Sequence, residues 1–434
     1  MIGLAIVAAT IVAYALVASR LDRVLISAPM VFVAVGAIVG TSMTGLLPFI
    51  VDNEVALVIT ETTLALVLFA DATTLRLRAV EGDAWTPGRL LFIGLPLTML
   101  LGTVVARGLF PDLGWVAAAL IAVILAPTDA ALGLAVVANR AVPARIRRAL
   151  NVESGLNDGI AAPFVAVLVT VLVAEEAVDG GSWFRESIGE IGLALVAAIV
   201  VGGVGGRALR FAHERGWTSP LSEQLAIIGL AVLSYELSIV IGGNGFIAAF
   251  AGGLVFGAAT GRMLDVRVEF TETTAMLASY LVWAIFGAVF AGPVIAAGLD
   301  PEPILYGIAS LTVIRMLPVA LAMIGTGFRV PTLLFLGWFG PRGLASVVFA
   351  LVAIETLGSQ TPVSQTVVSV VTWTVLLSIV AHGLSASPLA RIYGPHIDAL
   401  GDVPEAMAVS EHRFRIRSLL DAQGHVRWHG RQEP

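Results

Sequence analysis

The chain has 434 residues, of which 58% are hydrophobic and only 13% are charged, and its mean hydropathy is +0.93. This composition excludes an ordinary soluble domain and indicates an integral membrane protein, in which the placement of charges matters more than the net charge of -6. Because a helical crossing needs about twenty apolar residues, the length allows roughly a dozen crossings and little else. The sequence has no cysteine, which excludes disulfides, thiolate metal sites and thiol redox chemistry.

About thirteen apolar stretches are expected to form membrane helices. In chain order they lie near residues 2–18, 24–49, 53–73, 90–109, 114–138, 149–174, 187–209, 222–241, 244–259, 271–297, 303–325, 332–354 and 363–387. Their long Ala, Val, Leu and Gly runs lack the polar alternation of a membrane β-barrel, so the expected fold is an all-α polytopic membrane protein. Because Arg20 and Arg23 follow the first stretch instead of preceding it, we expect a retained helix, with a cleaved signal peptide as the alternative.

The basic residues, all 25 of them arginine, are distributed unevenly between alternate connections. If the N-terminus lies outside, one side of the membrane holds Arg20, Arg23, Arg76, Arg78, Arg89, Arg140, Arg145, Arg147, Arg148, Arg210, Arg215, Arg262, Arg267, Arg329 and the tail arginines Arg391, Arg413, Arg415 and Arg417. The opposite loops hold only Arg107 and Arg185, with the acids Asp52, Asp112, Glu175, Glu176, Asp179, Asp300 and Glu302. By the positive-inside rule, we expect a multi-pass protein of the cell membrane with a cytoplasmic C-terminus.

The apolar run after residue 149 begins with unusually polar residues. Ser154 and Asp158 are four apart and therefore lie one helical turn apart on one face. Their oxygens are the hard donors that alkali cations prefer, and an acid inside a span is a functional candidate by default. A purely structural role for Asp158, as a cap or a pairing partner, remains the alternative.

Glu153 and Asn157 are also four apart, but on a face turned away from Asp158. Arg315 lies in the middle of the span at 303–325, and an unpaired guanidinium there would cost several kcal/mol. Since arginine does not deprotonate in proteins, Arg315 is expected to form a structural ion pair, with Glu153 as its partner.

Two apolar runs are interrupted by proline beside a charged residue. The first break is Pro127-Thr128-Asp129, and the second is Gly340-Pro341-Arg342-Gly343. Broken helices at membrane depth expose backbone groups that can cap a helix or coordinate a cation, as Asp129 and Thr128 are placed to do. Two such breaks in corresponding halves indicate an inverted-repeat transporter with a site near the midplane, although a simple proline kink at Pro127 is the alternative.

Other ionisable residues in the apolar runs are less informative. Asp71 ends the run at 53–73 just before Arg76, and an interfacial position is as good an interpretation as a functional one. Glu61, Glu236 and Glu272 have no ligand set beside them in the sequence. His382 has no second histidine or cysteine at metal spacing, so zinc or haem is not expected.

The ordered combination of Ala126-Pro-Thr-Asp129, Glu153-Ser-Gly-Leu-Asn-Asp158, Arg315 and Gly340-Pro-Arg-Gly343 resembles the NhaP-type sodium/proton antiporters of the cation:proton antiporter superfamily, which include the animal sodium/hydrogen exchangers. The resemblance covers about residues 1–390. It implies a homodimer in the lipid membrane and two discontinuous crossing helices within inverted repeats. It also implies a core bundle at about 88–174 and 303–387, a scaffold and dimerisation part at about 1–75 and 187–297, and a short cytoplasmic tail at 396–434.

The resemblance also implies roles for single residues. Asp158 would bind the ion and the proton, with Ser154 and Thr128 as further ligands of the alkali cation. Asn157 would be the amide that marks the electroneutral branch of the family. Glu153 and Arg315 would form the stabilising ion pair, Asp129 would lie at the helix crossing and Asp71 near the cytoplasmic funnel.

These expectations combine into a function in ion transport and pH homeostasis. Burial favours the neutral form of a carboxyl group and a bound cation favours its charged form, so Asp158 can hold a proton or a cation by turns. The expected activity is electroneutral exchange of one Na+ for one H+, with K+/H+ exchange as the alternative, and neither an enzymatic activity nor a cofactor or nucleic-acid partner is expected. Two rivals are less well supported. A protease needs a base beside Ser154, and a channel needs a filter loop that is not found in the sequence.

Overall fold

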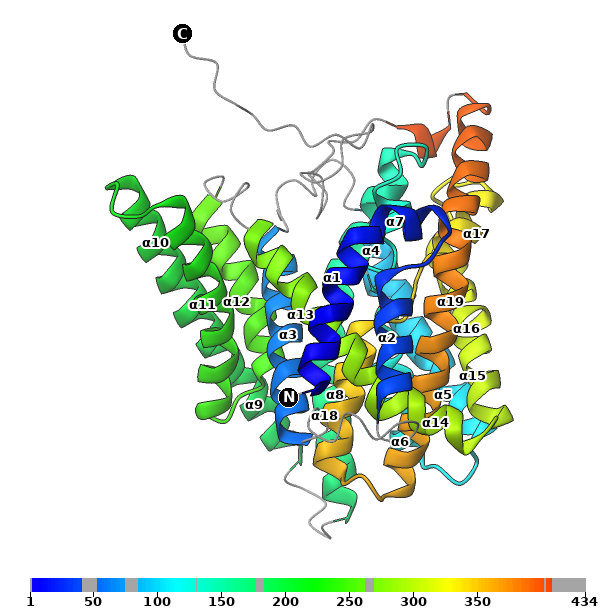
Figure 1. The fold of residues 1–434 in the computed structure, drawn as a ribbon, viewed down its shortest axis with the longest axis horizontal. Helices are drawn as coiled ribbons and strands as arrows, with labels where there is room; N and C mark the ends of the chain where they lie inside the picture. The colour runs from blue at the N-terminus through cyan, green and yellow to red at the C-terminus, as the bar shows by residue number, and fades with distance from the viewer. Residues whose placement is uncertain are drawn as a thin grey trace.

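The protein is described here by a computed structural model covering residues 2–40, 53–74, 85–129, 131–176, 183–261, 269–401 and 403–407 (Figure 1). The secondary structure of these residues is helical. The α-helices are α1 (Ile2–Arg23), α2 (Ala28–Val39), α3 (Asn53–Thr74), α4 (Trp85–Arg89), α5 (Leu95–Leu109), α6 (Trp115–Ile124), α7 (Leu134–Val137), α8 (Ala144–Glu176), α9 (Trp183–Ala198), α10 (Gly205–Glu214), α11 (Pro220–Val240), α12 (Gly245–Thr260), α13 (Glu269–Phe286), α14 (Gly292–Ala297), α15 (Pro301–Leu311), α16 (Val313–Ala322), α17 (Val330–Trp338), α18 (Leu344–Leu357) and α19 (Pro362–Asp398). Short π-helical segments join α4 to α5, α9 to α10 and α13 to α14, and a 3-10 turn, η6 (Pro404–Ala406), follows α19.

Within the described residues, eight helical stretches are long and apolar enough to cross a membrane, and five shorter apolar helices accompany them. The all-α membrane fold expected from the sequence is confirmed, whereas the number of thirteen crossings stays a prediction. In Figure 1, α9 to α13 and α3 occupy one side of the molecule, α4 to α7 with α15 to α17 and α19 occupy the other, and α18 lies near the middle beside α8. Helix α8 lies between the two groups, because it packs against α6 and α18 as well as against α9, α12 and α3.

Both predicted helix breaks are present. The first separates α6 from α7 over residues 125–133, and the second separates α17 from α18 over residues 339–343. Pro127 and Pro341 lie within the breaks, where a residue without an N–H cannot continue a helix. Helix α6 enters from the lower end of Figure 1 and α17 from the upper end, so the two half-helices run in opposite directions. The breaks cross, because the backbone N–H of Asp129 donates to the carbonyl oxygen of Pro341 at 2.8 Å.

The lengths of three helices differ from the sequence-based expectation. Helix α19 continues to Asp398, eleven residues beyond the expected end at 387, and helix α8 begins at Ala144. The stretch expected at 303–325 is interrupted at Thr312, which separates α15 from α16. Residues 41–49 of the second expected span lie outside the described residues, as do Arg76, Arg78, Arg262, Arg267, Asp52, Asp179 and the tail from residue 408 onward.

Small residues bring the helices of the first group close together. A Cβ atom at Gly253 or Gly257 of α12 would lie 2.5 Å from the carbonyl oxygen of Phe69 or 2.7 Å from that of Thr73, both on α3. Such close backbone approach is typical of helix packing in membranes, where small residues form the interface. The contact fixes the end of α3 that carries Asp71.

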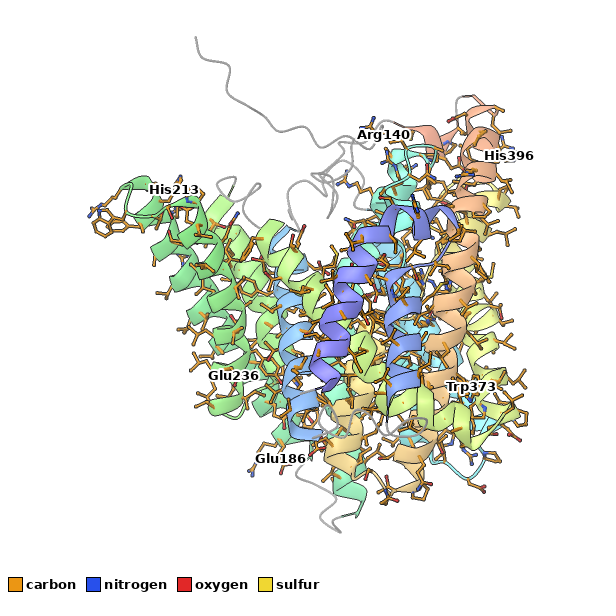
Figure 2. All side chains as sticks on the ribbon, viewed as in Figure 1. Arg140, Glu186, His213, Glu236, Trp373 and His396 are labelled. Carbon is orange, nitrogen blue, oxygen red and sulfur yellow. The ribbon has the colours of Figure 1, made fainter. Side chains whose placement is uncertain are left out.

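The two ends of the bundle differ in charge. Figure 2 shows Arg140, His213 and His396 at the upper end, and Glu186 and Glu236 toward the lower end. The described arginine-rich connections, including those at 140–148, 210–215 and 329, therefore lie at one end of the molecule. This is the end that the positive-inside rule assigns to the cytoplasm.

Candidate ion-binding site

The carboxylate of Asp129 connects the two breaks through hydrogen bonds to backbone N–H groups. One carboxylate oxygen accepts hydrogen bonds from the backbone N–H groups of Ala131 at 2.7 Å and Leu132 at 3.2 Å. The other accepts from the N–H of Leu344, the first residue of α18, at 2.9 Å. A carboxylate in this position satisfies otherwise unpaired N–H groups and complements the positive end of the helix dipole. Asp129 is thus placed as the helix cap that the sequence indicated.

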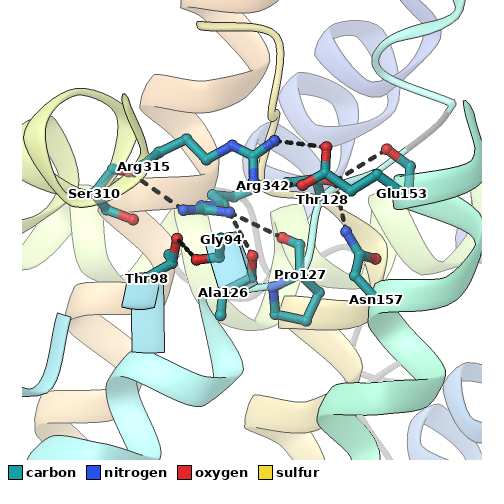
Figure 3. Close-up of polar contacts among 11 residues, drawn as sticks. Gly94, Thr98, Ala126, Pro127, Thr128, Glu153, Asn157, Ser310, Arg315 and Arg342 are labelled. Carbon is teal, nitrogen blue, oxygen red and sulfur yellow. Dashed lines mark hydrogen bonds and ion pairs between the residues drawn. The ribbon is translucent and has the colours of Figure 1, made fainter. Parts of the chain in front are cut away.

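Each half-helix that ends at the crossing has a buried arginine at its negative end. Arg342 is fully buried and donates to the carbonyl oxygen of Ala126 at 2.6 Å, of Pro127 at 3.3 Å and of Ser310 at 3.3 Å (Figure 3). Arg315 lies against the end of α17, where a Cβ atom added to Gly340 would be only 2.4 Å from its Nε. Guanidinium groups are favourable at helix C-termini, because the exposed carbonyl groups there carry partial negative charge.

Arg315 and Glu153 lie together, as the sequence analysis expected. Two parallel hydrogen bonds join the guanidinium to the carboxylate, at 2.5 Å and 2.8 Å, and both side chains are 1% exposed (Figure 3). A bidentate geometry of this kind is the strong form of the interaction. The pair ties α16 to α8 directly beside the crossing.

Thr128 is the centre of a second buried group. Its hydroxyl lies 3.0 Å from the hydroxyl of Ser154 and accepts a 2.6 Å hydrogen bond from the side-chain amide of Asn157. All three side chains are buried. Asn157 therefore lies at the site together with Ser154, although helical spacing had placed the two on different faces. Asp158 is one turn after Ser154 on α8 and is 8% exposed.

Ser154 and Asp158 face a cavity of about 460 Å³ between the two groups of helices. Asp71 lines it from α3, so the structure brings this residue to the same cavity as Asp158. The lining also includes Asn151, on α8 three residues before Ser154, and Glu272 and Thr273 of α13. Sequence reasoning gave these three residues no role, and Glu272 and Thr273 are distant from Asp158 in the chain. Residues 25–27, between α1 and α2, and residues 272–273, in the first turn of α13, line the cavity, so it extends toward the upper end of the molecule in Figure 1.

Three acids and two arginines lie on the elements around the crossing, namely Glu153, Asp129, Asp158, Arg315 and Arg342. Glu153 is paired with Arg315, and Asp129 and Arg342 form hydrogen bonds with the backbone at helix ends. Asp158 differs from the other two acids in that it faces the cavity together with Ser154.

Both ring nitrogens of His382 lie within hydrogen-bond distance of backbone carbonyl oxygens. Its Nε2 lies 2.8 Å from the carbonyl oxygen of Trp338, and its Nδ1 lies 2.9 Å from that of Ser378. The ring thereby links α19 to the end of α17. Among the described residues, no group of three His, Cys, Asp or Glu side chains is placed to hold a metal ion.

Two interrupted helices that cross at a buried carboxylate define an all-helical membrane protein with the fold of a secondary transporter. Sequence comparison gives the family: the transmembrane model of the sodium/hydrogen exchanger family matches residues 6–392, and the chain belongs to this family. The resemblance seen in the motifs is confirmed.

Individual relatives agree with this assignment. The K(+)/H(+) antiporter NhaP2 of Shewanella sp. (strain ANA-3) is 24% identical over 394 residues, which cover 89% of this chain and 66% of the relative. The K(+)/H(+) antiporter NhaP of Alkalimonas amylolytica is 25% identical over 381 residues, which cover 87% of this chain and 63% of the relative. The chain thus spans somewhat less than two thirds of the length of these relatives.

A solved structure shows the same fold. The sodium proton antiporter MjNhaP1 from Methanocaldococcus jannaschii superimposes with a TM-score of 0.71 at 21% sequence identity. The match covers 91% of this chain and 100% of that one. The two expected helix interruptions are present in this chain, between α6 and α7 and between α17 and α18, and its overall fold matches that of this antiporter.

Proposed function

We propose that the protein is a secondary antiporter that exchanges a monovalent alkali cation for a proton at Asp158. The observation that carries the proposal is the position of Ser154 and Asp158 on the wall of a cavity, with the Ser154 hydroxyl 3.0 Å from the buried hydroxyl of Thr128. Asp158, Ser154 and Thr128 would supply the oxygen ligands that a hard cation prefers. The amide of Asn157 would orient the Thr128 hydroxyl.

Competition for one carboxylate couples the two ions. Desolvation favours the protonated acid and a cation favours the carboxylate, so Asp158 holds one or the other. The bundle around the crossing can change the side to which Asp158 is accessible only when the charge of its carboxylate is neutralised, because moving a bare charge through the membrane is costly. Exchange of one cation for one proton moves no net charge. The membrane potential, worth about 2.3 kcal/mol per charge per 100 mV, would then neither drive nor oppose it.

The proposal extends to the assembly, the orientation in the membrane and the moving parts of the protein. The protein would be a homodimer in the cell membrane, with its N-terminus outside and its C-terminus in the cytoplasm, so that the cavity opens to the cytoplasm. Residues 88–174 and 303–387 would form the mobile core, and 1–75 and 187–297 the scaffold. It would act as a transporter and not as an enzyme, without cofactor or nucleic-acid partner, and serve pH homeostasis.

Na+ is the cation we propose first, in line with the family to which the chain belongs. K+ is the second candidate, because the two curated relatives described above are named K(+)/H(+) antiporters. Both ions take oxygen ligands, so the ligand types favour neither of them.

The test uses purified protein in proteoliposomes that carry a pH gradient and an internal pH dye. Addition of NaCl, LiCl or KCl should collapse the gradient with saturation, and Asp158→Asn should abolish the response while the protein remains folded. For Na+ and Li+, a K+/valinomycin clamp should leave the rate unchanged. Cation-dependent proton flux that persists in Asp158→Asn would refute the assignment, and flux without counter-transport would favour a channel.

A further inference from the structure

The residues that follow α19 are folded against the membrane helices. Glu405, in the turn η6, is fully buried, which is rare for a glutamate unless its charge has partners. One of its carboxylate oxygens accepts the backbone N–H of Arg329 at 2.7 Å and the hydroxyl of Thr332 at 2.9 Å. The Thr332 hydroxyl also lies 3.0 Å from the phenol of Tyr393 on α19. The carboxylate of Glu405 thus binds at the start of α17.

Arg145 provides a second attachment for the same segment. Its Nη1 donates to the carbonyl oxygen of Pro404 at 2.7 Å, and its Nη2 donates to the hydroxyl of Thr86 at 3.3 Å. The guanidinium also lies 4.9 Å from the ring centre of Phe328. Beside this contact, Val403 is 4% exposed and packs into a cluster with buried apolar residues of α8, α17 and α19.

These attachments lead to α4, α17 and α19 and to α8, the helix between the two groups. Arg145 and Thr86 belong to α8 and α4, Thr332 belongs to α17, and Tyr393 belongs to α19. Within the described part of the chain, the polar contacts of residues 403–407 go to α8 and to the start of α17, and none goes to α9 to α13.

We propose that Glu405 is a positioning residue for the ion site, and that residues 399–401 and 403–407 belong to the transport bundle. Helix α17 has nine residues, so its start is only about 13 Å from the second break at a rise of 1.5 Å per residue. A carboxylate that accepts the N–H of Arg329, directly before so short a helix, and the hydroxyl of Thr332 in its first turn holds the start of that helix in position. Through the bond between Asp129 and Pro341, that position also sets the neighbourhood of Thr128. The proposal rests on the proposed antiport.

The first test separates positioning from stability through substitutions at Glu405. Glu405→Ala removes the acceptor, and we expect the KM for the cation to rise at least fivefold, because the break is no longer held. Glu405→Gln retains an acceptor oxygen and should stay within twofold of the parent protein. Glu214→Ala, at an exposed acid of α10 near the same end, is the matched control. A purely structural role would reduce the amount of folded protein and the Vmax but leave KM unchanged, and that result would overturn the proposal.

The second test measures attachment without relying on transport. The chain has no cysteine, so spin labels can be placed at Met407→Cys with Val330→Cys on the start of α17, or with Trp217→Cys near α11, and all three positions are exposed. Labelled protein is diluted with unlabelled protein to suppress distances between subunits. The distance from 407 to 330 should be narrow and equal at high Na+ and at low pH, and Glu405→Ala should broaden it.

The two pairs of label positions together distinguish the attachment of residues 403–407 from the mobile bundle of the proposed antiport. If the bundle moves, the distance from 407 to 217 should change between the two conditions while that from 407 to 330 stays fixed. If neither distance changes, the mobile bundle of the proposed function is refuted while the attachment stands. A broad distance from 407 to 330 in the unsubstituted background would overturn the attachment itself.

Discussion

Thr128 shows how a single hydroxyl can organise a site. It accepts from Asn157 and shares a hydrogen bond with Ser154, so it connects the first break to α8 without contributing a charge. Thr128→Val keeps the shape but leaves the buried amide of Asn157 without its acceptor, a loss that costs about 1–3 kcal/mol. We therefore expect the KM for the cation to rise at least fivefold in proteoliposomes. Thr128→Ser keeps the hydroxyl and should restore a nearly normal KM, and equal effects of both substitutions would contradict this role.

The ion pair of Arg315 and Glu153 allows a prediction about stability. Removal of one partner from a buried pair leaves an uncompensated charge and costs about 3–5 kcal/mol. Glu153→Gln should therefore lower the Tm of the purified protein markedly. Glu214→Gln breaks the exposed i,i+4 contact to Arg210 at 3.7 Å, a type of pair worth about 0.3–0.5 kcal/mol, and should leave the Tm nearly unchanged. Similar shifts for the two variants would argue against a structural role for the buried pair.

At the scale of elements, the close approach of the two breaks depends on Gly343. A Cβ atom there would lie 2.1 Å from the carboxylate oxygen of Asp129 that caps α18. Gly343→Ala must displace this carboxylate, and we expect the exchange rate to fall at least tenfold. Gly229→Ala in α11 is the control, because its Cβ atom would meet nothing within 4 Å. Helical Gly to Ala replacement at such an open site is neutral to stabilising. Normal exchange by Gly343→Ala would show that the cap at α18 is dispensable.

The breaks could be predicted from the sequence because proline and charge inside an apolar run have few explanations. The pairing of Glu153 with Arg315 followed from the same logic, since a lone guanidinium at membrane depth needs a carboxylate. The interruption at Thr312 could not be predicted, because no proline or glycine lies at that position and the run remains apolar. The end of α19 could not be predicted either, because its last turns lie beyond the apolar run and are held by tertiary contacts such as that between Tyr393 and Thr332.

At the scale of the whole molecule, the candidate site needs both groups of helices. Helix α8, between the two groups, contributes Asp158 and Ser154, whereas Asp71 and Glu272 line the cavity from α3 and α13. Local sequence patterns identify the first pair, because both residues lie on one helix. They cannot identify the second pair, since only the packing of distant helices brings these residues to the same cavity. The cavity therefore depends on how the two groups of helices pack against each other, and a change in that packing would change access to Asp158.

The direction of that access can be measured with single cysteines. Asn151 lines the cavity, whereas Ser359 is exposed in the connection between α18 and α19 at the opposite end. If the arginine-rich end is cytoplasmic, a membrane-impermeant maleimide should label Asn151→Cys only in inside-out vesicles and Ser359→Cys only in right-side-out vesicles. Because Asp158 lies deeper than the cavity mouth, labelling of Asn151→Cys should also slow the entry of cations from that side. Labelling of Asn151→Cys only in right-side-out vesicles would contradict the proposed orientation, because the cavity would then open to the outside.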